Sequence, residues 1–386
     1  MLFRSMRAAI IFPIAKFLSC AVMLLILSGV VMVISGQAFA AAERCDEPVF
    51  GVQGVRVDQS AETASMARDI GSKLASKNAF NEMLSRLLGD QDEISAFISN
   101  NDLDQFMDFV HIVEEKNLDR RYIATLDFCF DAPRLRQAMI SAGLRWAELR
   151  SPNILIIPVW RGPDGVRAWD KGNKWITGWW DAVKAWDGLL ALRVLERNLI
   201  NERRFRGEDL AESSAETIAQ AASLANAEQV LIVQAALDFN QASPEVSVTT
   251  SLYGKNGGFI APIDHFDPIP MENSRAVELV DIRAKIIGRM TRSWHSANLI
   301  DGSALYETLV YVPVSSLQEW AMRLKALDQV AVILSYDILS LDTRGGLVRL
   351  RLAGSPQALE NALAAHHLRL LDENGTMLIT ANIGSG

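Results

Sequence analysis

Alternating apolar and polar residues begin the first predicted segment, which spans about residues 45–147. Phe50–Asp58 alternates as a strand does, and Gly54 shifts the phase as a β-bulge would. Residues 109–131 predict a hairpin whose second strand places its aromatic residues on one face and Cys129 on the other. A helix at about residues 133–149 completes a small αβ N-terminal domain. Between the strands, a helical apolar stripe predicts a long helix: Met66, Ala67, Ile70, Leu74, Met83, Leu84 and Leu87.

The second segment, at about residues 152–300, predicts a central α/β domain. Asn153–Trp160 is a continuous apolar run of strand length, which is typical of a buried strand. The capping box Ser213–Glu216 opens a helix that reaches about Ala225. Strands are expected over 229–239 and 246–254, a loop over 255–275 and a helix over 274–298. A further helix over 189–200 would place four apolar residues on one side: Leu192, Leu195, Leu199 and Ile200.

The third segment, at about residues 303–384, follows the order βαββαβ, which is the ferredoxin-like pattern. Capping signals at Ser316 and at Ser355–Pro356 open its two helices. Residues 347–352 alternate, with Leu347, Arg349 and Arg351 on one face of the strand. The three segments together predict a multi-domain protein of the mixed α/β (α+β) class.

Tryptophan is concentrated in the central segment, where six of the nine tryptophans lie within residues 160–186. Trp175 and Trp179 are four residues apart and share one face of a predicted helix, whereas Trp180 points elsewhere. Gly178 weakens that helix by about 1 kcal/mol relative to alanine. Two interpretations follow: packing in a core or between domains, or a ligand or partner surface made by Trp169, Trp175, Trp179 and Trp180.

Residues 1–40 have the pattern of an export signal. Basic residues precede an uncharged apolar run at 17–36, and small residues at Ala38 and Ala40 fit a signal-peptidase site after Ala40. The run approaches the length of about 20 residues that spans a bilayer, so an uncleaved anchor in the inner membrane is the alternative. Both alternatives place the rest of the chain in the periplasm.

Charge and cysteine content agree with export. Removing residues 1–40, which contain three basic and no acidic residues, takes the net charge from −8 to −11. An acidic chain without basic patches is a poor candidate for binding nucleic acid. Cys45 and Cys129 are then the remaining cysteines, and in an oxidising compartment they are either a disulfide pair or two unpaired thiols.

Three groups of motifs, in their order along the chain, resemble a bacterial family known as domain of unknown function 2066. They are VRVD with ARDIGSKLASKNAFNEML, SPNILIIPVW with GLLALRVLERN, and VYVPVSSLQEWAMRLKALDQVAVI with LVRLRLAGSPQALENALAAHHLRLL. The resemblance covers most of residues 48–380. It implies no particular activity.

Two weaker resemblances concern single segments. The first segment resembles the N-terminal domain of the flagellar assembly protein of the periplasmic H-ring. The second, through ILIIPV, LERNLI and QVLIVQAAL, is similar to the N-terminal domain of the Tol–Pal translocation protein. These likenesses imply modules for assembly and docking in the cell envelope, by analogy of fold.

Catalytic and metal-binding motifs are not found in the sequence, which lacks CxxC, HxxxH, HExxH, GxSxG and GxxxxGK spacings. The loop with Asp264, His265 and Asp267 is the most chemically suggestive cluster, but three residues of one loop rarely form a closed site. We therefore expect no enzyme activity, no cofactor and no metal. The sequence favours an exported cell-envelope protein that acts in the periplasm as a non-catalytic interaction or assembly module, with envelope proteins as partners. The alternative is a carbohydrate- or peptidoglycan-binding protein that uses the region Trp169–Trp186.

Overall fold

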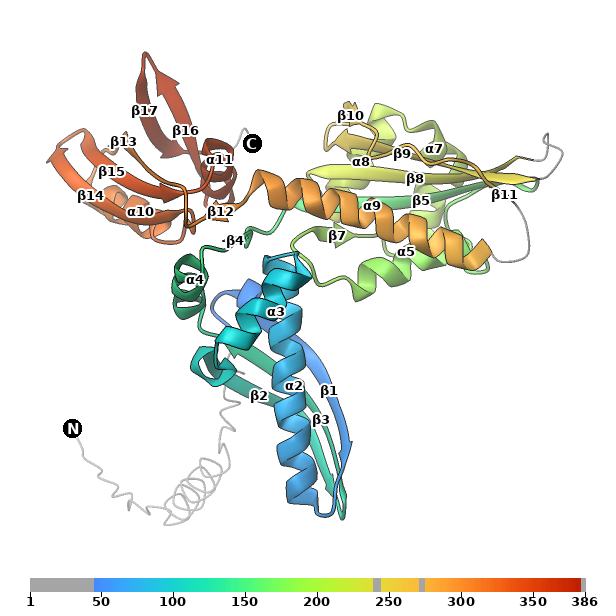
Figure 1. The fold of residues 1–386 in the computed structure, drawn as a ribbon. Coiled ribbons are helices and arrows are strands. Elements are labelled where there is room, and N and C mark those ends of the chain that lie inside the picture. The colour runs from blue at the N-terminus through green and yellow to red at the C-terminus, as the bar shows by residue number, and fades with distance from the viewer. Residues whose placement is uncertain (1–44, 239–243, 271–274, 383–386) are drawn as a thin grey trace, which may run out of the picture. The chain divides into compact units, whose positions relative to one another are not determined.

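The computed structural model describes residues 45–238, 244–270 and 275–382 (Figure 1). The export signal and anchor predicted within residues 1–40 lie outside these ranges. The described residues form a mixed α/β protein, as the sequence predicts, and they contain four separate sheets. Each of the three larger sheets stays within one of the three predicted segments.

The N-terminal segment folds as a long helix on a three-stranded antiparallel sheet of order β1-β3-β2 (Figure 1). The predicted bulge is present, because Gly54 has φ 71° and the β1–β3 register shifts between Val52 and Val55. The elements are η2 (Pro48–Phe50), β1 (Gly51–Ser60), α2 (Ala64–Leu87), α3 (Gln91–Asn100), η3 (Leu103–Phe106), β2 (Met107–Leu118), β3 (Arg121–Phe130) and α4 (Ala132–Ser141).

Helix α2 buries a different stripe from the one expected over its first half. Of the predicted residues there, Met66, Ile70 and Leu74 are exposed, so the buried residues are Ala67, as predicted, and Ala75, which was not predicted. Gly71, which lies between those two, explains the difference: a Cβ on it would lie 2.5 Å from Cγ1 of Val57. Small residues therefore face the sheet because the helix approaches it closely.

The C-terminal end of this segment also differs from the expectation. The helix predicted at 133–149 ends at Ser141, and Gly143 follows with φ 67°. A left-handed glycine just past the last turn is a common way to end a helix. The chain then forms the short strand β4 (Arg145–Trp146), which pairs with β12 (Ile300–Asp301).

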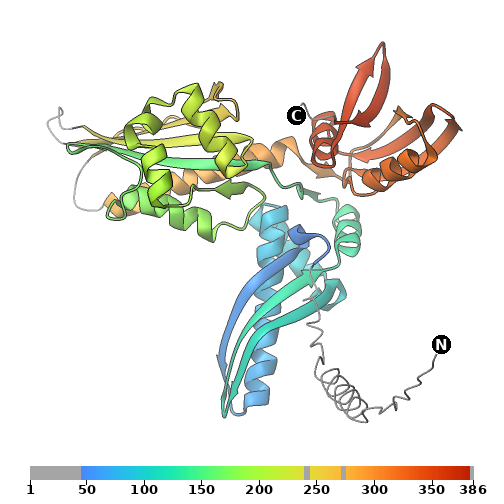
Figure 2. The same cartoon turned by 180° about the vertical axis from the view of Figure 1, so that it is seen from behind.

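The central segment is a sheet with helices on both faces, where β5 and β8 run parallel at the centre. Figures 1 and 2 show α5 and α9 on one face and α7 and α8 on the other. Alternate residues of β5 enter different cores: Ile154 and Ile156 pack with Trp175, and Leu155 packs with Phe205. The elements are β5 (Asn153–Gly162), β6 (Gly165–Arg167), α5 (Lys174–Ala185), β7 (Ala191–Arg193), α6 (Leu199–Arg204), α7 (Gly207–Glu212), α8 (Ala215–Ala225), β8 (Gln229–Asp238), β9 (Glu245–Gly254), β10 (Phe259–Ala261), β11 (Ile269–Pro270) and α9 (Arg275–Ala297).

The prediction of a helix over residues 189–200 is wrong. Its middle is strand β7, where Leu192 pairs with Ile154 of β5 in parallel register. Leu199 and Ile200 instead open α6 and are 71% and 76% exposed, so they do not share a buried face with Leu192. Pairing with the edge of the sheet overrides the helical spacing, as tertiary context often does.

The C-terminal segment is consistent with a ferredoxin-like domain, with one strand more than βαββαβ. Its sheet has the order β14-β15-β13-β17-β16, and β17 is inserted beside β13 in parallel. Val348, Leu350 and Leu352 are buried on the inner face of β15, as their alternation predicts. The elements are β13 (Leu305–Pro313), α10 (Leu317–Leu327), β14 (Ile333–Asp342), β15 (Gly345–Ala353), α11 (Pro356–Ala365), β16 (Leu368–Glu373) and β17 (Thr376–Ala381).

Candidate functional site

The structure joins Cys45 and Cys129, the candidate pair, by a disulfide bond. Residues 45–51, which we call the N-terminal strap, lead from this disulfide into β1. Gly51 pairs with Cys129 across β1 and β3, and a Cβ on Gly51 would lie 3.3 Å from Cβ of Cys45. The disulfide therefore fixes the strap to β3.

The prediction of a ligand or partner surface made by four tryptophans is wrong for two of them, Trp175 and Trp179. Trp175 and Trp179 are 1% and 0% exposed and belong to the core between the sheet and α9. Trp169 is half-buried and donates a hydrogen bond of 2.7 Å to the Phe205 carbonyl. Trp169 and Trp180 line a cavity of about 10 Å³, which holds at most one water. The four rings therefore do not form an open platform for a flat ligand.

The Asp264 loop uses its polar groups internally. The Asp264 carboxylate pairs with Arg289 at 2.8 Å, and its backbone N–H donates to Thr250 Oγ1 at 3.2 Å. Within the described residues, no group of three or more histidine, cysteine or acidic side chains is arranged to hold a metal ion.

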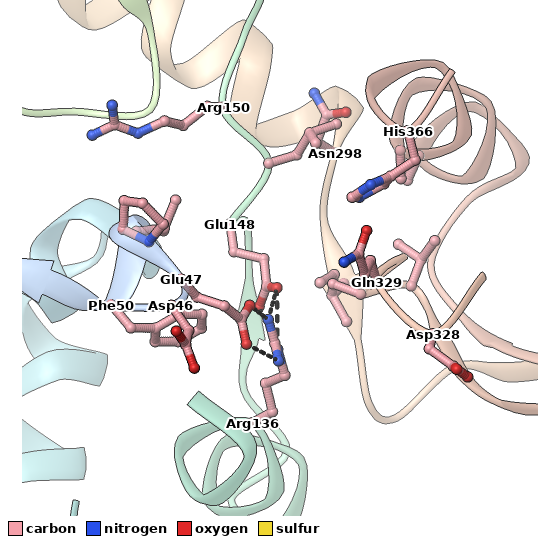
Figure 3. A pocket seen from close by; sticks show the side chains of 18 residues that line it. Asp46, Glu47, Phe50, Arg136, Glu148, Arg150, Asn298, Asp328, Gln329 and His366 are labelled. Carbon is pink, nitrogen blue, oxygen red and sulfur yellow. Dashed lines mark hydrogen bonds and ion pairs between the residues drawn. The ribbon is translucent and has the colours of Figure 1, made fainter. Parts of the chain in front are cut away.

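One pocket, which we call the junction pocket, lies between the N-terminal strap and the C-terminal segment and has a volume of about 760 Å³ (Figure 3). Its most prominent charge is Arg136 of α4. Arg136 donates from Nε to both oxygens of Glu148 at 3.1 Å and from Nη1 to Glu47 at 3.0 Å. Trp146 Nε1 donates a further bond of 2.8 Å to Glu148.

This Glu47–Arg136–Glu148 cluster satisfies its own charges. Burial acts to lower the pKa of Arg136, but hydrogen bonds and charge from Glu148 and Glu47 outweigh it and raise that pKa. The Arg136 guanidinium also lies 5.0 Å from the centre of the Phe50 ring. The cluster thus holds the strap against α4, and we assign it a structural role.

A second arginine, the buried Arg86 of α2, also holds the strap. Its Nη1 donates to the carbonyls of Val49 and Gly51 at 2.7 and 2.9 Å. Its Nε donates to the Asp187 carbonyl at 2.8 Å, and its Nη2 pairs with the Asp187 carboxylate. Arg86 therefore links the strap to the segment that follows α5.

A larger pocket, which we call the α5–α9 pocket, has a volume of about 1050 Å³ and is lined by α5, α9 and the corner between α2 and α3. Its apolar wall includes Leu88, Trp186, Val280, Ile287 and Leu299. The basic side chains that line it are Arg145, Arg283, Arg292 and His295. The acidic ones are Asp90, Glu93 and Asp181. An apolar pocket with a few polar groups is the usual form of a binding site.

Arg283 is the unusual residue of this pocket. It is 9% exposed, and its guanidinium forms no hydrogen bond or ion pair with a described residue. Burial lowers its pKa, and the charge of Asp181 acts in the opposite direction. A Cβ on Gly178 would lie 2.5 Å from Cζ of Arg283, so the helical glycine makes room for the guanidinium. A buried charge without a partner is costly, which makes Arg283 a candidate binding residue.

His295 lies at the edge of the α5–α9 pocket and gives a testable pH dependence. Its Nε2 lies 3.1 Å from the Arg86 carbonyl, and burial lowers its pKa while that hydrogen bond acts to raise it. Because the pKa in the fold is below the unfolded value of about 6.5, the unfolded state binds more protons as the pH falls. Stability is therefore complete above that value and decreases below it.

We expect the urea midpoint to fall between about pH 7 and pH 5, and to fall less in His295→Gln. His366, whose pKa burial also lowers, leaves part of the dependence in that variant. The exposed His265 supplies the control, since His265→Gln should follow the wild-type profile. An unchanged pH profile in His295→Gln would contradict this account.

The sequence contains one signal for the α5–α9 pocket, namely Gly178, which helical propensity alone treats as a weak point of the helix. Gly178 interrupts a predicted helix, and an isolated helical glycine often has a packing reason. Its partner Arg283 lies about a hundred residues later in the chain, so spacing could not connect the two.

No family model matches the chain. No curated protein matches it either. A solved structure of lipoprotein GNA1162 from Neisseria meningitidis is similar over 37% of this chain and 99% of that chain, with 13% identity and a TM-score of 0.24. A TM-score this low establishes no common fold. The resemblance to domain of unknown function 2066 stays a prediction from its motifs. Among the described helices, none combines the length and the apolar character that crossing a membrane requires.

Proposed function

We propose that this protein is an exported module of the bacterial cell envelope that binds an envelope protein through the α5–α9 pocket. The observation that supports binding is the unpaired Arg283 in a largely apolar pocket of about 1050 Å³. The function is therefore interaction or assembly, with the pocket as the contact site.

The disulfide supports an extracytoplasmic location. Disulfides persist in the periplasm and are rare in the reducing cytosol. Cys45 and Cys129 are joined and Cys129 is 3% exposed. This agrees with the export signal predicted from residues 1–40, and we propose the periplasm as the compartment.

The chemistry of the pocket supports binding over catalysis. A guanidinium remains protonated at all physiological pH values, so Arg283 is suited to hold an anion and unsuited to remove a proton. Outside this pocket, the carboxylates of Glu148 and Asp264 are held in ion pairs with Arg136 and Arg289. We therefore propose a non-catalytic role.

Photo-cross-linking in cells tests this proposal. Ala284 is exposed and lines the pocket, whereas Lys285 is exposed on the same helix but does not line it. A photoreactive residue at Ala284 should give a discrete adduct with one envelope protein in the periplasmic fraction, and the same residue at Lys285 should not. Equal adducts at both positions, no adduct at Ala284, or recovery of the chain in the cytosol would each contradict the proposal.

A further inference from the structure

The surroundings of Arg283 indicate which chemical group would complement the α5–α9 pocket. The residue is nine-tenths buried, and no described residue accepts a hydrogen bond from its guanidinium. Protein atoms enclose Nη1, so the side of the guanidinium that carries Nε and Nη2 is the one left for a ligand. Asp181 acts on it only through longer-range charge. A planar guanidinium binds a carboxylate through two parallel hydrogen bonds, which makes a carboxylate the best complement to this site.

We propose that the α5–α9 pocket captures the C-terminal end of a partner protein, with the terminal carboxylate bound by Arg283 and apolar last residues against Trp186 and Ile287. This proposal rests on the function proposed above, because it names the part of the envelope partner that enters the pocket.

Gly178 and Arg283 together form the receptor for the carboxylate. The guanidinium carbon lies 2.5 Å from where a Cβ of residue 178 would stand, and Nη2 and Nη1 lie 2.6 and 2.7 Å from it. The guanidinium therefore packs on the backbone of α5 rather than extending into water. A guanidinium held in this way is pre-oriented for its partner, and less entropy is lost on binding.

The acidic side chains of the pocket favour a peptide over a fatty acid. Glu93, which is half-buried, and Asp181, which is exposed, line the pocket, and both carboxylates are open to donors from a ligand. A peptide backbone brings N–H donors for such acceptors, whereas an acyl chain brings none. A ligand with a carboxylate for Arg283 and N–H groups for the acidic side chains complements the pocket best, and a peptide end has both.

The position of the pocket favours a chain end over an internal acidic residue. Its walls come from α5, α9 and the α2–α3 corner, and Arg283 is only 9% exposed between them. A terminus needs one exit from such a pocket, while an internal residue needs two. The terminal carboxylate is thus the anion that reaches Arg283 with the least distortion of the chain.

Fluorescence anisotropy with two peptide pools tests the proposal. The probes are labelled hexapeptides ending in three random positions drawn from alanine, valine, leucine and phenylalanine, made as free acids and as C-terminal amides. The oxidised wild-type chain should bind the free acids at least about 10-fold more tightly than the amides, since hydrogen bonds to charged groups contribute about that factor or more. Dodecanoate serves as the acyl competitor.

Two variants and one control test whether Arg283 is the residue that binds the terminal carboxylate. Arg283→Met removes the guanidinium, and Gly178→Ala displaces it while keeping the charge. Both should reduce the preference for free acids to less than about 2-fold, because the charge-assisted bond is lost. Lys285→Met removes a cation from the same helix outside the pocket and should retain the full preference. Thermal unfolding of each variant verifies that it is folded, and Gly178→Ala gives the answer if Arg283→Met is not.

The outcomes separate this inference from the proposed function. Equal binding of acids and amides overturns carboxylate capture, although peptide binding itself still supports an interaction module. Failure of both pools, or Arg283-dependent binding of dodecanoate in their place, overturns the peptide as occupant. Absence of the cross-link at Ala284 instead contradicts the envelope function on which the inference rests.

Discussion

Replacing Arg136 by methionine is expected to lower the free energy of unfolding by about 3–5 kcal/mol, the range found when one partner of a buried ion pair is removed. The loss of stability arises from the two acidic side chains that remain without their cation. The Glu148 side chain is 7% exposed and would lose its cation, and Glu47 would lose the bonds that hold the N-terminal strap to α4. Urea unfolding of the oxidised protein measures the change.

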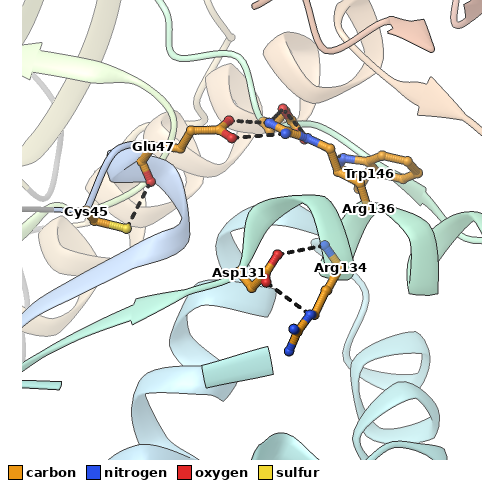
Figure 4. A network of polar contacts seen from close by, with 7 residues as sticks. Cys45, Glu47, Asp131, Arg134, Arg136 and Trp146 are labelled. Atoms are coloured by element: carbon orange, nitrogen blue, oxygen red, sulfur yellow. Dashed lines mark hydrogen bonds and ion pairs between the residues drawn. The ribbon is translucent and has the colours of Figure 1, made fainter. Parts of the chain in front are cut away.

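Arg134 provides the matched control on the same helix, where Figure 4 shows it paired with Asp131 apart from Arg136. Its side chain is 67% exposed, so Arg134→Met should cost no more than about 1 kcal/mol. The double variant Arg136→Met/Glu148→Gln should recover part of the loss, because it removes the unpaired buried charge. Equal stability of the Arg136 and Arg134 variants would show that the cluster contributes nothing beyond a surface ion pair.

Local pattern was sufficient to predict most of the helices and strands. The β1 bulge at Gly54 and the inner face of β15 depend only on residues near in sequence, and both are as predicted. Where residues far apart in the sequence determine which face of an element is buried, the prediction from local pattern was wrong. Gly71 lets α2 approach Val57 of β1, and that contact moved the buried stripe from Met66, Ile70 and Leu74 to their smaller neighbours.

Local pattern was also insufficient to predict the candidate site. Six clustered tryptophans are a strong local signal, but burial is set by the whole domain, and it placed Trp175 and Trp179 in the core. The pair Gly178–Arg283 carries the site, and it exists only because α5 and α9 pack on the same face of the sheet (Figure 1). No local spacing relates a glycine to an arginine that far along the chain.

Removing the disulfide is expected to have an effect of similar size, for a different reason. The bond closes a loop with a sequence separation of 84 residues. The chain-entropy model assigns a loop of that length about 4–5 kcal/mol, and native disulfides typically contribute 2–5 kcal/mol. In the folded state, Arg86 and Arg136 still hold the strap through Val49, Gly51 and Glu47, so the loss should arise mainly from a less constrained unfolded chain.

Urea unfolding with and without a thiol reductant tests this account. The double variant Cys45→Ser/Cys129→Ser should unfold like the reduced wild type and should not respond to the reductant. Its binding of the free-acid peptides should be unchanged, because neither cysteine lines the α5–α9 pocket. If reduction left the midpoint of the wild type unchanged, the strap would be held by its arginines alone. A loss of peptide binding in the folded double variant would instead mean that the disulfide shapes the pocket through Arg86, which donates hydrogen bonds to both the strap and Asp187.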